Sequence, residues 1–199
     1  MSPPPPPDPS SIDPALLLEA YASGLFPMAM EDGSLSWFSP DPRGIIPIYD
    51  FHIPRGLRKT LRHNPFEIRV NSAFAETLRG CADRESTWIS EPIHRSYLAL
   101  HHLGYAHSVE VWQDQTLVGG LYGVSLGGAF FGESMFSRVP NASKVALAAL
   151  VSRLQARGYA LLDTQWVTEH LTQFGAHEIP RSAYLKALRQ ALPRTCTFT

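Results

Sequence analysis

Apolar residues in the middle of the chain recur with the period of β-strands, which predicts a sheet. Two neighbouring segments alternate apolar and polar residues, as strands with one buried face do, and a polar Asp-Gln turn joins them. A later segment, YALLD, is a continuous apolar run typical of fully buried strands. The expected strands are residues 66–70, 107–113, 116–125, 129–137 and 159–165.

Apolar residues spaced three or four apart predict helices between these strands. The first helix is expected to begin at Asp13, because aspartate is a good N-cap and Pro14 suits the first helical position. It is expected to end near Gly24. Residues 26–47 are expected to be loop-rich, because each proline biases the preceding residue to an extended conformation. Further helices are expected over residues 54–63, 72–81, 91–104 and 142–157, with Asn71 or Ser72, Ser90 and Asn141 as N-caps, and two short helices close the chain.

The order of these elements favours an α+β (mixed α/β) fold with a central antiparallel-rich sheet. A length of 199 residues suits one domain, or one medium domain with a small appendage. Residues 1–11 are dominated by proline and are expected to be a disordered, extended and solvated tail without a function of its own.

Composition narrows the class of protein. Hydrophobic residues make up 44% and charged residues 18% of the chain, which allows a substantial core and excludes global disorder. The net charge of -1 excludes a histone-like basic protein but leaves room for a local basic patch. Cys81 and Cys196 lie far apart, which excludes a zinc ribbon or a disulfide scaffold and favours a reducing compartment. The sequence has no secretory signal and no apolar run of about 18 residues, so a cytoplasmic protein without a membrane span is expected.

Several common catalytic and cofactor motifs are missing from the sequence. It contains no P-loop and no GxGxxG turn between a strand and a helix. Ser134 in GESMF resembles a nucleophile elbow, but Phe136 stands where that motif needs glycine. The eight histidines are scattered without metal-ligand spacing, so no metal site is expected.

Four cations, Arg55, Arg58, Lys59 and Arg62, fall on one face of an expected helix and form what we call the basic strip. The strip fits two interpretations equally well. It is either a solvated face of an amphipathic helix or a phosphate-binding surface on an otherwise neutral protein.

Two carboxylates occupy unusual positions on apolar strands. Glu133 follows GAFFG and Asp163 ends YALLD. A carboxylate on a buried strand is unfavourable unless it is paired or functional. The simpler interpretation is a residue at the end of a strand that caps the next element or forms an ion pair. Gln165 lies two residues after Asp163, so an extended strand would direct both side chains to one face, where they could hold one substrate group. Trp37, Phe38 and Trp88 fit either the core or a stacking surface.

Several long motifs, in order, resemble those of the leucyl/phenylalanyl-tRNA–protein transferases. The resemblance covers about residues 12–190 and leaves out the proline-rich start. Its motifs are GLFP (24–27), WFSPDPRG (37–44), TWI (87–89), AHSVEVW with LVGGLYGV (106–124), FGESMFS (131–137), NASKVAL (141–147), LLDTQ (161–165) and His170 followed by GAHEIPR (170–181).

The resemblance implies transfer of leucine or phenylalanine, and less readily methionine, from aminoacyl-tRNA to the N-terminal arginine or lysine of acceptor proteins. This modification tags the acceptor for N-degron proteolysis. The resemblance also implies a monomer with a small N-terminal domain, residues 12–50, and an acyltransferase domain similar to the GNAT enzymes, residues 51–199. It implies no metal and no organic cofactor, because the aminoacyl ester is already activated.

The family motifs assign expected roles to individual residues. Asp163 and Gln165 would orient the acceptor amine and manage its proton, although proton transfer through the terminal ribose of the tRNA is a competing account. Glu133, or Asp163, would bind the acceptor's cationic side chain. The remaining assignments are Leu121, Phe130 and Leu162 to the apolar donor pocket, Trp88 and Met28 to the terminal adenosine, and Arg55, Lys59 and Arg62 to the tRNA body.

Two positions depart from the family pattern. Met28 stands where family members often carry a tryptophan, so one side of the adenosine platform stacks less well. Thr164 replaces a common cysteine, and its side chain is expected on the opposite strand face, where the effect is small.

Three other functions compete with this one. A related leucyltransferase would act on N-terminal aspartate or glutamate, which Glu133 disfavours. A catalytically silent tRNA- or N-degron-binding protein is disfavoured by Asp163 and Gln165, but Met28 leaves this alternative open. An acetyl-CoA-dependent acetyltransferase is disfavoured because no glycine-rich turn opens the helix at Asn141.

Overall fold

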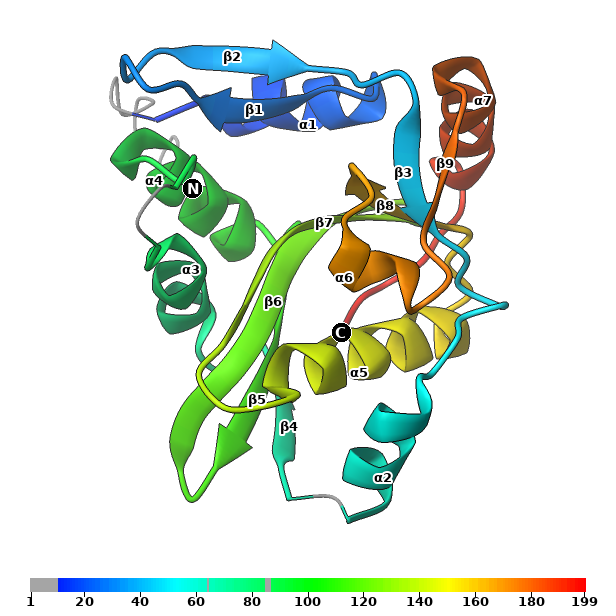
Figure 1. Ribbon diagram of the computed structural model, residues 1–199. Coiled ribbons are helices and arrows are strands. Elements are labelled where there is room, and N and C mark those ends of the chain that lie inside the picture. Colours follow the sequence, from blue (N-terminus) through cyan, green and yellow to red (C-terminus); the bar gives the residue numbers. More distant parts are fainter. Residues whose placement is uncertain (1–10, 64, 85–86) are drawn as a thin grey trace.

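Among the residues that the structure describes, seven strands form one mixed sheet and two further strands form a separate hairpin (Figure 1). The computed structural model describes residues 11–63, 65–84 and 87–199. All neighbouring strands of the large sheet are antiparallel except β7 and β8, which are parallel. Its order is β4 (Glu67–Val70), β5 (Ala106–Gln113), β6 (Thr116–Leu126), β7 (Ala129–Ser137), β8 (Leu161–Gln165), β3 (Arg43–Ile46) and β9 (His177–Ile179).

Helices cover both faces of this sheet and divide the core in two. One cluster of buried side chains comes from α1 (Pro14–Ala22), α3 (Phe74–Ala82), α4 (Glu91–His102) and α7 (Arg181–Ala191). The other comes from α2 (Arg55–His63), α5 (Ala142–Ala156) and α6 (Glu169–Thr172). The hairpin of β1 (Phe26–Ala29) and β2 (Leu35–Phe38) lies beside α1 at the upper end of the molecule (Figure 1). The expected α+β class is confirmed.

Most elements expected from the local pattern are present. The five predicted strands and the helices at 54–63, 91–104 and 142–157 match the structure within a few residues. Asp13 caps α1 as expected, because its Oδ1 accepts a hydrogen bond from the Ala15 N–H at 2.7 Å. The tail expected over residues 1–11 falls, for residues 1–10, outside the described residues.

The prediction of a loop-rich segment over residues 26–47 was wrong, because three strands form there. β3 pairs with β8 and β9, and both of these strands lie more than 100 residues further along the chain. Because its partners are so distant, the local sequence pattern does not predict this strand. Gly44 permits this position, since a Cβ atom there would lie 2.7 Å from the Trp166 carbonyl carbon. The segment expected to form the N-terminal domain thus supplies one strand of the large sheet, and the division at residue 50 stays a prediction.

The predicted N-caps of three helices form no side-chain cap. The start of α3 is instead capped from β5. The buried carboxylate of Glu110 accepts hydrogen bonds from the Ala73 N–H at 3.3 Å and the Ser72 hydroxyl at 3.0 Å. Asn71 accepts from the Ser108 N–H, and Asn141 donates to Thr60. The capping groups here come from distant elements, which sequence spacing does not reveal.

The two parallel strands pair only over their first residues. β7 and β8 are aligned from Ala129 beside Leu161 to Phe131 beside Asp163. β7 then continues to Ser137, whereas β8 ends at Gln165. The strands therefore separate in the middle of the sheet, and side chains from both core regions can reach the gap.

Candidate active site

A cavity of about 730 Å³ lies where β7 and β8 separate. Residues 132–138 of β7 and the turn after it line one side. Thr164, Gln165 and Trp166 line the other. Residues of both core clusters line the cavity, Leu121 and Leu162 from one and Tyr122 and Phe136 from the other.

One wall of the cavity is apolar. Leu121 of β6 and Leu162 of β8 line it, as expected. Phe130 was expected there too, but it is not among the described residues that line the cavity. It is fully buried and stacks on Phe198 at 5.1 Å between ring centroids. The other apolar wall residues are Ile46, Leu147, Leu150 and Leu171, and this surface can hold an apolar side chain.

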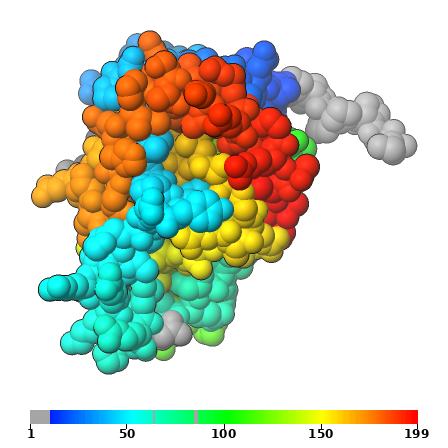
Figure 2. Space-filling view, turned by 90° about the vertical axis from the view of Figure 1, so that its right-hand side faces the viewer, coloured from blue at the N-terminus to red at the C-terminus, as the bar shows by residue number. Residues whose placement is uncertain are grey.

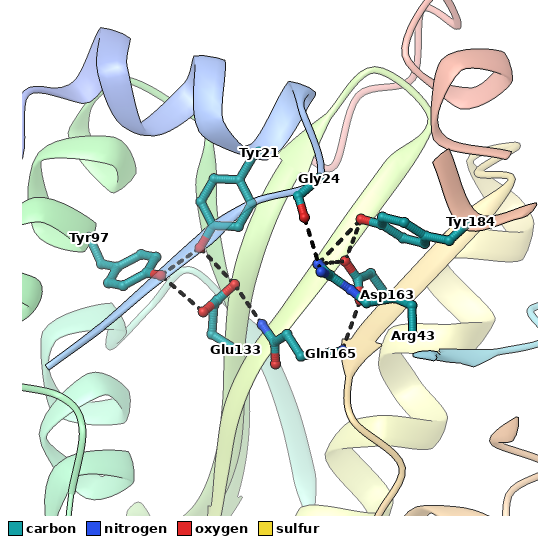
Figure 3. Close-up of polar contacts among 8 residues, drawn as sticks. All are labelled: Tyr21, Gly24, Arg43, Tyr97, Glu133, Asp163, Gln165 and Tyr184. Atoms are coloured by element: carbon teal, nitrogen blue, oxygen red, sulfur yellow. Dashed lines mark hydrogen bonds and ion pairs between the residues drawn. The ribbon is translucent and has the colours of Figure 1, made fainter. Parts of the chain in front are cut away.

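The opposite end of the cavity is polar and contains Glu133, which is 8% exposed. Its Oε1 accepts a hydrogen bond from the Tyr21 hydroxyl at 2.7 Å, and its Oε2 accepts one from the Tyr97 hydroxyl at 2.9 Å (Figure 3). Gln165 Nε2 lies 3.2 Å from Oε1. Burial raises the pKa of Glu133 to about 7, although the hydrogen bonds from both tyrosines act against this rise. Glu133 is therefore a carboxyl group that titrates near neutral pH.

The sequence reasoning missed Tyr21 and Tyr97 as site residues. Both side chains are 0% exposed, and burial raises the pKa of each well above the usual value of 10.0. Each tyrosine lies on the apolar face of its helix and so matches an ordinary core residue in the sequence. Only the packing of α1 and α4 on the sheet brings both hydroxyls to Glu133.

Asp163 belongs to a buried ion pair with Arg43. Arg43 Nε donates to Oδ1 at 2.9 Å and Arg43 Nη2 donates to Oδ2 at 2.6 Å, with both side chains at most 1% exposed (Figure 3). The Tyr184 hydroxyl donates to Oδ2 at 2.7 Å. Asp163 is not among the described residues that line the cavity. The ion-pair interpretation of this carboxylate is confirmed, and Arg43 is its missed partner.

Gln165 connects this ion pair to the cavity. Its backbone is not extended, as the strand pattern predicted, but left-handed, with φ of 61°. The Gln165 N–H donates to Asp163 Oδ1 at 2.8 Å, which stabilises this conformation. The side chain then lines the cavity and reaches Glu133. Asp163 thus stabilises the backbone conformation of Gln165, and the side chain of Gln165 is accessible to a molecule bound in the cavity.

Aromatic residues lie around the cavity. Trp88, for which the sequence predicted a stacking role, lines it. Met28 is half-buried against the core and is not among the described lining residues. Trp166 also lines the cavity, is 40% exposed and contacts Phe26 edge-on at 5.2 Å between ring centroids. The structure thus offers two tryptophans at the cavity.

The basic strip lies on α2, at the opposite end of the molecule from the hairpin (Figure 1). Figure 2 shows α2 in cyan at the lower end of one face and α7 in orange-red at the upper end. Arg55, Lys59 and Arg62 are exposed, while Leu57 is 2% exposed and anchors the helix. Within the described part of the chain, no carboxylate forms an ion pair with these three cations.

Among the described residues, no group of three or more histidine, cysteine, aspartate or glutamate side chains could hold a metal ion. No helix in this part of the chain is long and apolar enough to cross a membrane.

The raised pKa of Glu133 predicts a pH-dependent stability. The folded-state pKa of about 7 exceeds the ordinary value of 4.5. The stabilising effect of this proton is therefore complete below the ordinary pKa and is lost as pH rises through 7. At 1.36 kcal/mol per pH unit, we expect the free energy of unfolding to decrease by about 3 kcal/mol over this range. Urea denaturation across pH would measure it.

The Glu133→Gln variant is the control for this prediction, because it removes the titrating group and keeps the shape. The wild type and Glu133→Gln share all other titrating groups. One of these is His107, because burial lowers its pKa to about 4. The difference between the two profiles therefore isolates Glu133. Parallel profiles would show that Glu133 does not titrate in this range.

An apolar wall, a buried carboxyl group and an amide meet in one cavity of an α+β fold. Such a site can hold an apolar group beside a cationic one. The chain matches the family model of the leucyl/phenylalanyl-tRNA protein transferase over residues 45–189 and that of its N-terminal domain over residues 10–41. The chain belongs to this family.

Three curated relatives bear the name leucyl/phenylalanyl-tRNA–protein transferase. The protein of Paramagnetospirillum magneticum is 57% identical over 189 residues, covering 92% of this chain and 90% of the relative. That of Phenylobacterium zucineum is 56% identical, covering 92% and 85%, respectively. That of Herpetosiphon aurantiacus is 53% identical, covering 94% and 98%. The predicted family and enzyme class are confirmed.

Among solved structures, the chain is similar to the C-terminal domain of a putative lysylphosphatidylglycerol synthetase from Agrobacterium fabrum, with a TM-score of 0.47 and 14% identity. That similarity covers 90% of this chain and 63% of the other. A GCN5-related N-acetyltransferase-like protein from Streptococcus suis gives a TM-score of 0.40 and 15% identity, covering 83% and 63%.

Proposed function

We propose that this protein transfers leucine or phenylalanine, and less readily methionine, from aminoacyl-tRNA to proteins with an N-terminal arginine or lysine. The observation that carries this proposal is the buried carboxyl group of Glu133 in a cavity that also has an apolar wall. The apolar wall suits the donor side chain, and the carboxyl group suits the acceptor's cation. The transferase would act as a cytoplasmic monomer and tag its acceptors for N-degron proteolysis.

The reaction needs placement of the substrates more than strong base catalysis. The nucleophile is an α-amine with an ordinary pKa of about 7.7–8.0, so a part of it is already neutral near pH 7. Holding this amine beside the ester replaces an encounter in solution and can supply a large part of the rate.

We propose that Gln165 contacts the acceptor amine and that Asp163 acts through it. An amide oxygen can accept a hydrogen bond from the amine and so orient its lone pair toward the ester carbonyl. Asp163 holds the left-handed backbone of Gln165 through its N–H and is itself held by Arg43. Its burial in this ion pair supports a positioning role and leaves the proton route through the tRNA ribose open.

We propose that the tRNA lies across two regions of the protein. Trp88, with Met28 nearby on β1, would contact the terminal adenosine, where base stacking contributes about 1–3 kcal/mol. The basic strip would contact phosphates of the tRNA body. The exposure of its cations without carboxylate partners in the described residues supports this role.

Charge reversal in the basic strip should weaken tRNA binding. The double variant Lys59→Glu with Arg62→Glu removes up to two phosphate contacts, so the slope of log affinity against log salt should fall by about 1.5–2. Lys186→Glu with Arg189→Glu is the matched control, because it also replaces one lysine and one arginine three residues apart on an exposed helix face. Equal slopes for both variants would indicate that the basic strip is a solvated helix face and does not bind phosphates.

The proposed function is tested by transfer of labelled leucine from leucyl-tRNA to peptides that begin with arginine or aspartate. Leucine on the arginine peptide alone is the expected result. Leucine on the aspartate peptide would overturn the role of Glu133, and bound tRNA without transfer would indicate a silent binding protein. A parallel reaction with acetyl-CoA should give no product.

A further inference from the structure

Three polar groups at the polar end of the cavity form a closed triangle. The hydroxyl oxygens of Tyr21 and Tyr97 lie 2.5 Å apart. Each hydroxyl also contacts one oxygen of Glu133, at 2.7 and 2.9 Å. All three side chains are buried, so each contact requires a proton between its two oxygens.

The number of protons decides the charge of Glu133. Two tyrosine hydroxyls supply two protons, which satisfy only two sides of the triangle when Glu133 is a carboxylate. The third side would then place two oxygens 2.5 Å apart without a proton between them. A protonated Glu133 supplies the third proton, and every side becomes a hydrogen bond.

Gln165 fixes the direction of these bonds. Its Nε2 group is a donor to Glu133 Oε1, so Oε1 is the carbonyl oxygen and accepts from both Gln165 and Tyr21. A carboxylate would accept a hydrogen bond from Tyr97, whereas protonation reverses this contact. The proton then lies on Oε2, which donates to Tyr97, and Tyr97 donates to Tyr21. This arrangement satisfies every polar atom of the triangle.

The surrounding charges agree with a neutral Glu133. The charges that act on it are Asp163 and Arg43, which pair with each other and so largely cancel. Tyr122 and Tyr184, whose phenol groups also interact with Glu133, are neutral because burial raises the pKa of both. Burial disfavours the charged form of Glu133 itself.

We propose that Glu133 is protonated in the empty site and releases this proton when a cationic acceptor side chain binds. The Oε2–H bond breaks, the proton passes through the cavity to water, and the new carboxylate pairs with the guanidinium or ammonium group. The cavity is neutral before and after this step. The identity of the acceptor rests on the proposed function, whereas the protonated resting state does not.

This exchange selects for the acceptor. A neutral N-terminal side chain offers no charge to stabilise the carboxylate, and an acidic one would meet a protonated carboxyl group without a cation. The empty site also avoids an unpaired buried charge, which would be strongly unfavourable.

Infrared spectroscopy of the protein without substrates tests the resting state. The spectrum of the wild type at about pH 6, below the titration of Glu133, should contain the carbonyl band of a protonated carboxylic acid, and Glu133→Gln should lack it. Glu110→Gln is the matched control and should keep the band, because Glu110 is also buried but its serine and backbone partners can all donate hydrogen bonds to its oxygens. No band difference between wild type and Glu133→Gln would overturn the proposal.

A second variant keeps this test independent of folding in Glu133→Gln. Tyr97→Phe removes one proton and two contacts, and it leaves Glu133 Oε2 without its acceptor. The carbonyl band of the protonated Glu133 should then move to higher wavenumber, because its Oε2–H has lost its hydrogen-bond acceptor. An unchanged band position in Tyr97→Phe would overturn the triangle.

Calorimetry in buffers of different ionisation enthalpy tests the release of the proton. Peptides beginning with arginine or with citrulline, its neutral isostere, would be added without aminoacyl-tRNA. At about pH 6 the arginine peptide should release close to one more proton than the citrulline peptide, and this excess should vanish above about pH 8. Glu133→Gln should show no excess at either pH.

The outcomes separate this proposal from the proposed function. Transfer to the arginine peptide without excess proton release would overturn the proton exchange and leave the function intact. A carboxylic acid band in a protein that transfers nothing would support the resting state and overturn the function.

Discussion

Replacing Arg43 by methionine is expected to lower the free energy of unfolding by about 3–5 kcal/mol. Asp163 is 0% exposed and Arg43 is its ion-pair partner, so the variant leaves a buried carboxylate without its counter-charge. Methionine preserves much of the packing of the long side chain between Phe26 and Tyr184. Urea denaturation at neutral pH measures the loss.

The double variant Arg43→Met with Asp163→Asn distinguishes charge from packing. Asparagine carries no charge and keeps an Oδ1 acceptor for the Gln165 N–H, while its NH2 group takes the place of Oδ2 and can donate to the Tyr184 hydroxyl oxygen. Most of the stability should return, because removing both charges of a buried pair is far less unfavourable than removing one. A loss below about 1 kcal/mol in Arg43→Met alone would show that Asp163 does not depend on this ion pair.

Replacing Gln165 is expected to reduce kcat/KM for transfer to an arginine peptide by about 100-fold, the scale of a misplaced reacting group. Gln165 contacts Asp163 through its backbone N–H and Glu133 through its side-chain amide, and this side chain lines the cavity. Gln165→Asn is the preferred variant, because asparagine tolerates the left-handed backbone, whereas its shorter side chain cannot reach the same place. Affinity for aminoacyl-tRNA should stay near that of the wild type.

The control for this experiment is Gln173→Ala. Gln173 is a half-buried glutamine that binds Lys144 and the His170 carbonyl and does not line the main cavity. Its loss should leave kcat/KM within about threefold of the wild type. Equal effects of the two variants, or full activity in Gln165→Asn, would remove Gln165 from the proposed mechanism.

The sequence by itself determined most elements and singled out the important carboxylates. Period and capping signals are local, so they were sufficient for the long strands, for α5 and for the Asp13 cap. A charge on an apolar strand is also visible locally, which is why Glu133 and Asp163 stand out in the sequence. The motifs identified the family in the same way, since they are contiguous stretches of chain.

Only the tertiary structure decided which groups these carboxylates meet. Arg43 lies 120 residues from Asp163, on a four-residue strand whose pairing partners are equally distant. Tyr21 and Tyr97 match ordinary core residues until α1 and α4 pack on one face of the sheet. The separation of β7 and β8 depends on how far each strand continues after their last pair. These contacts depend on packing between elements that are distant in sequence, so local sequence patterns do not predict them.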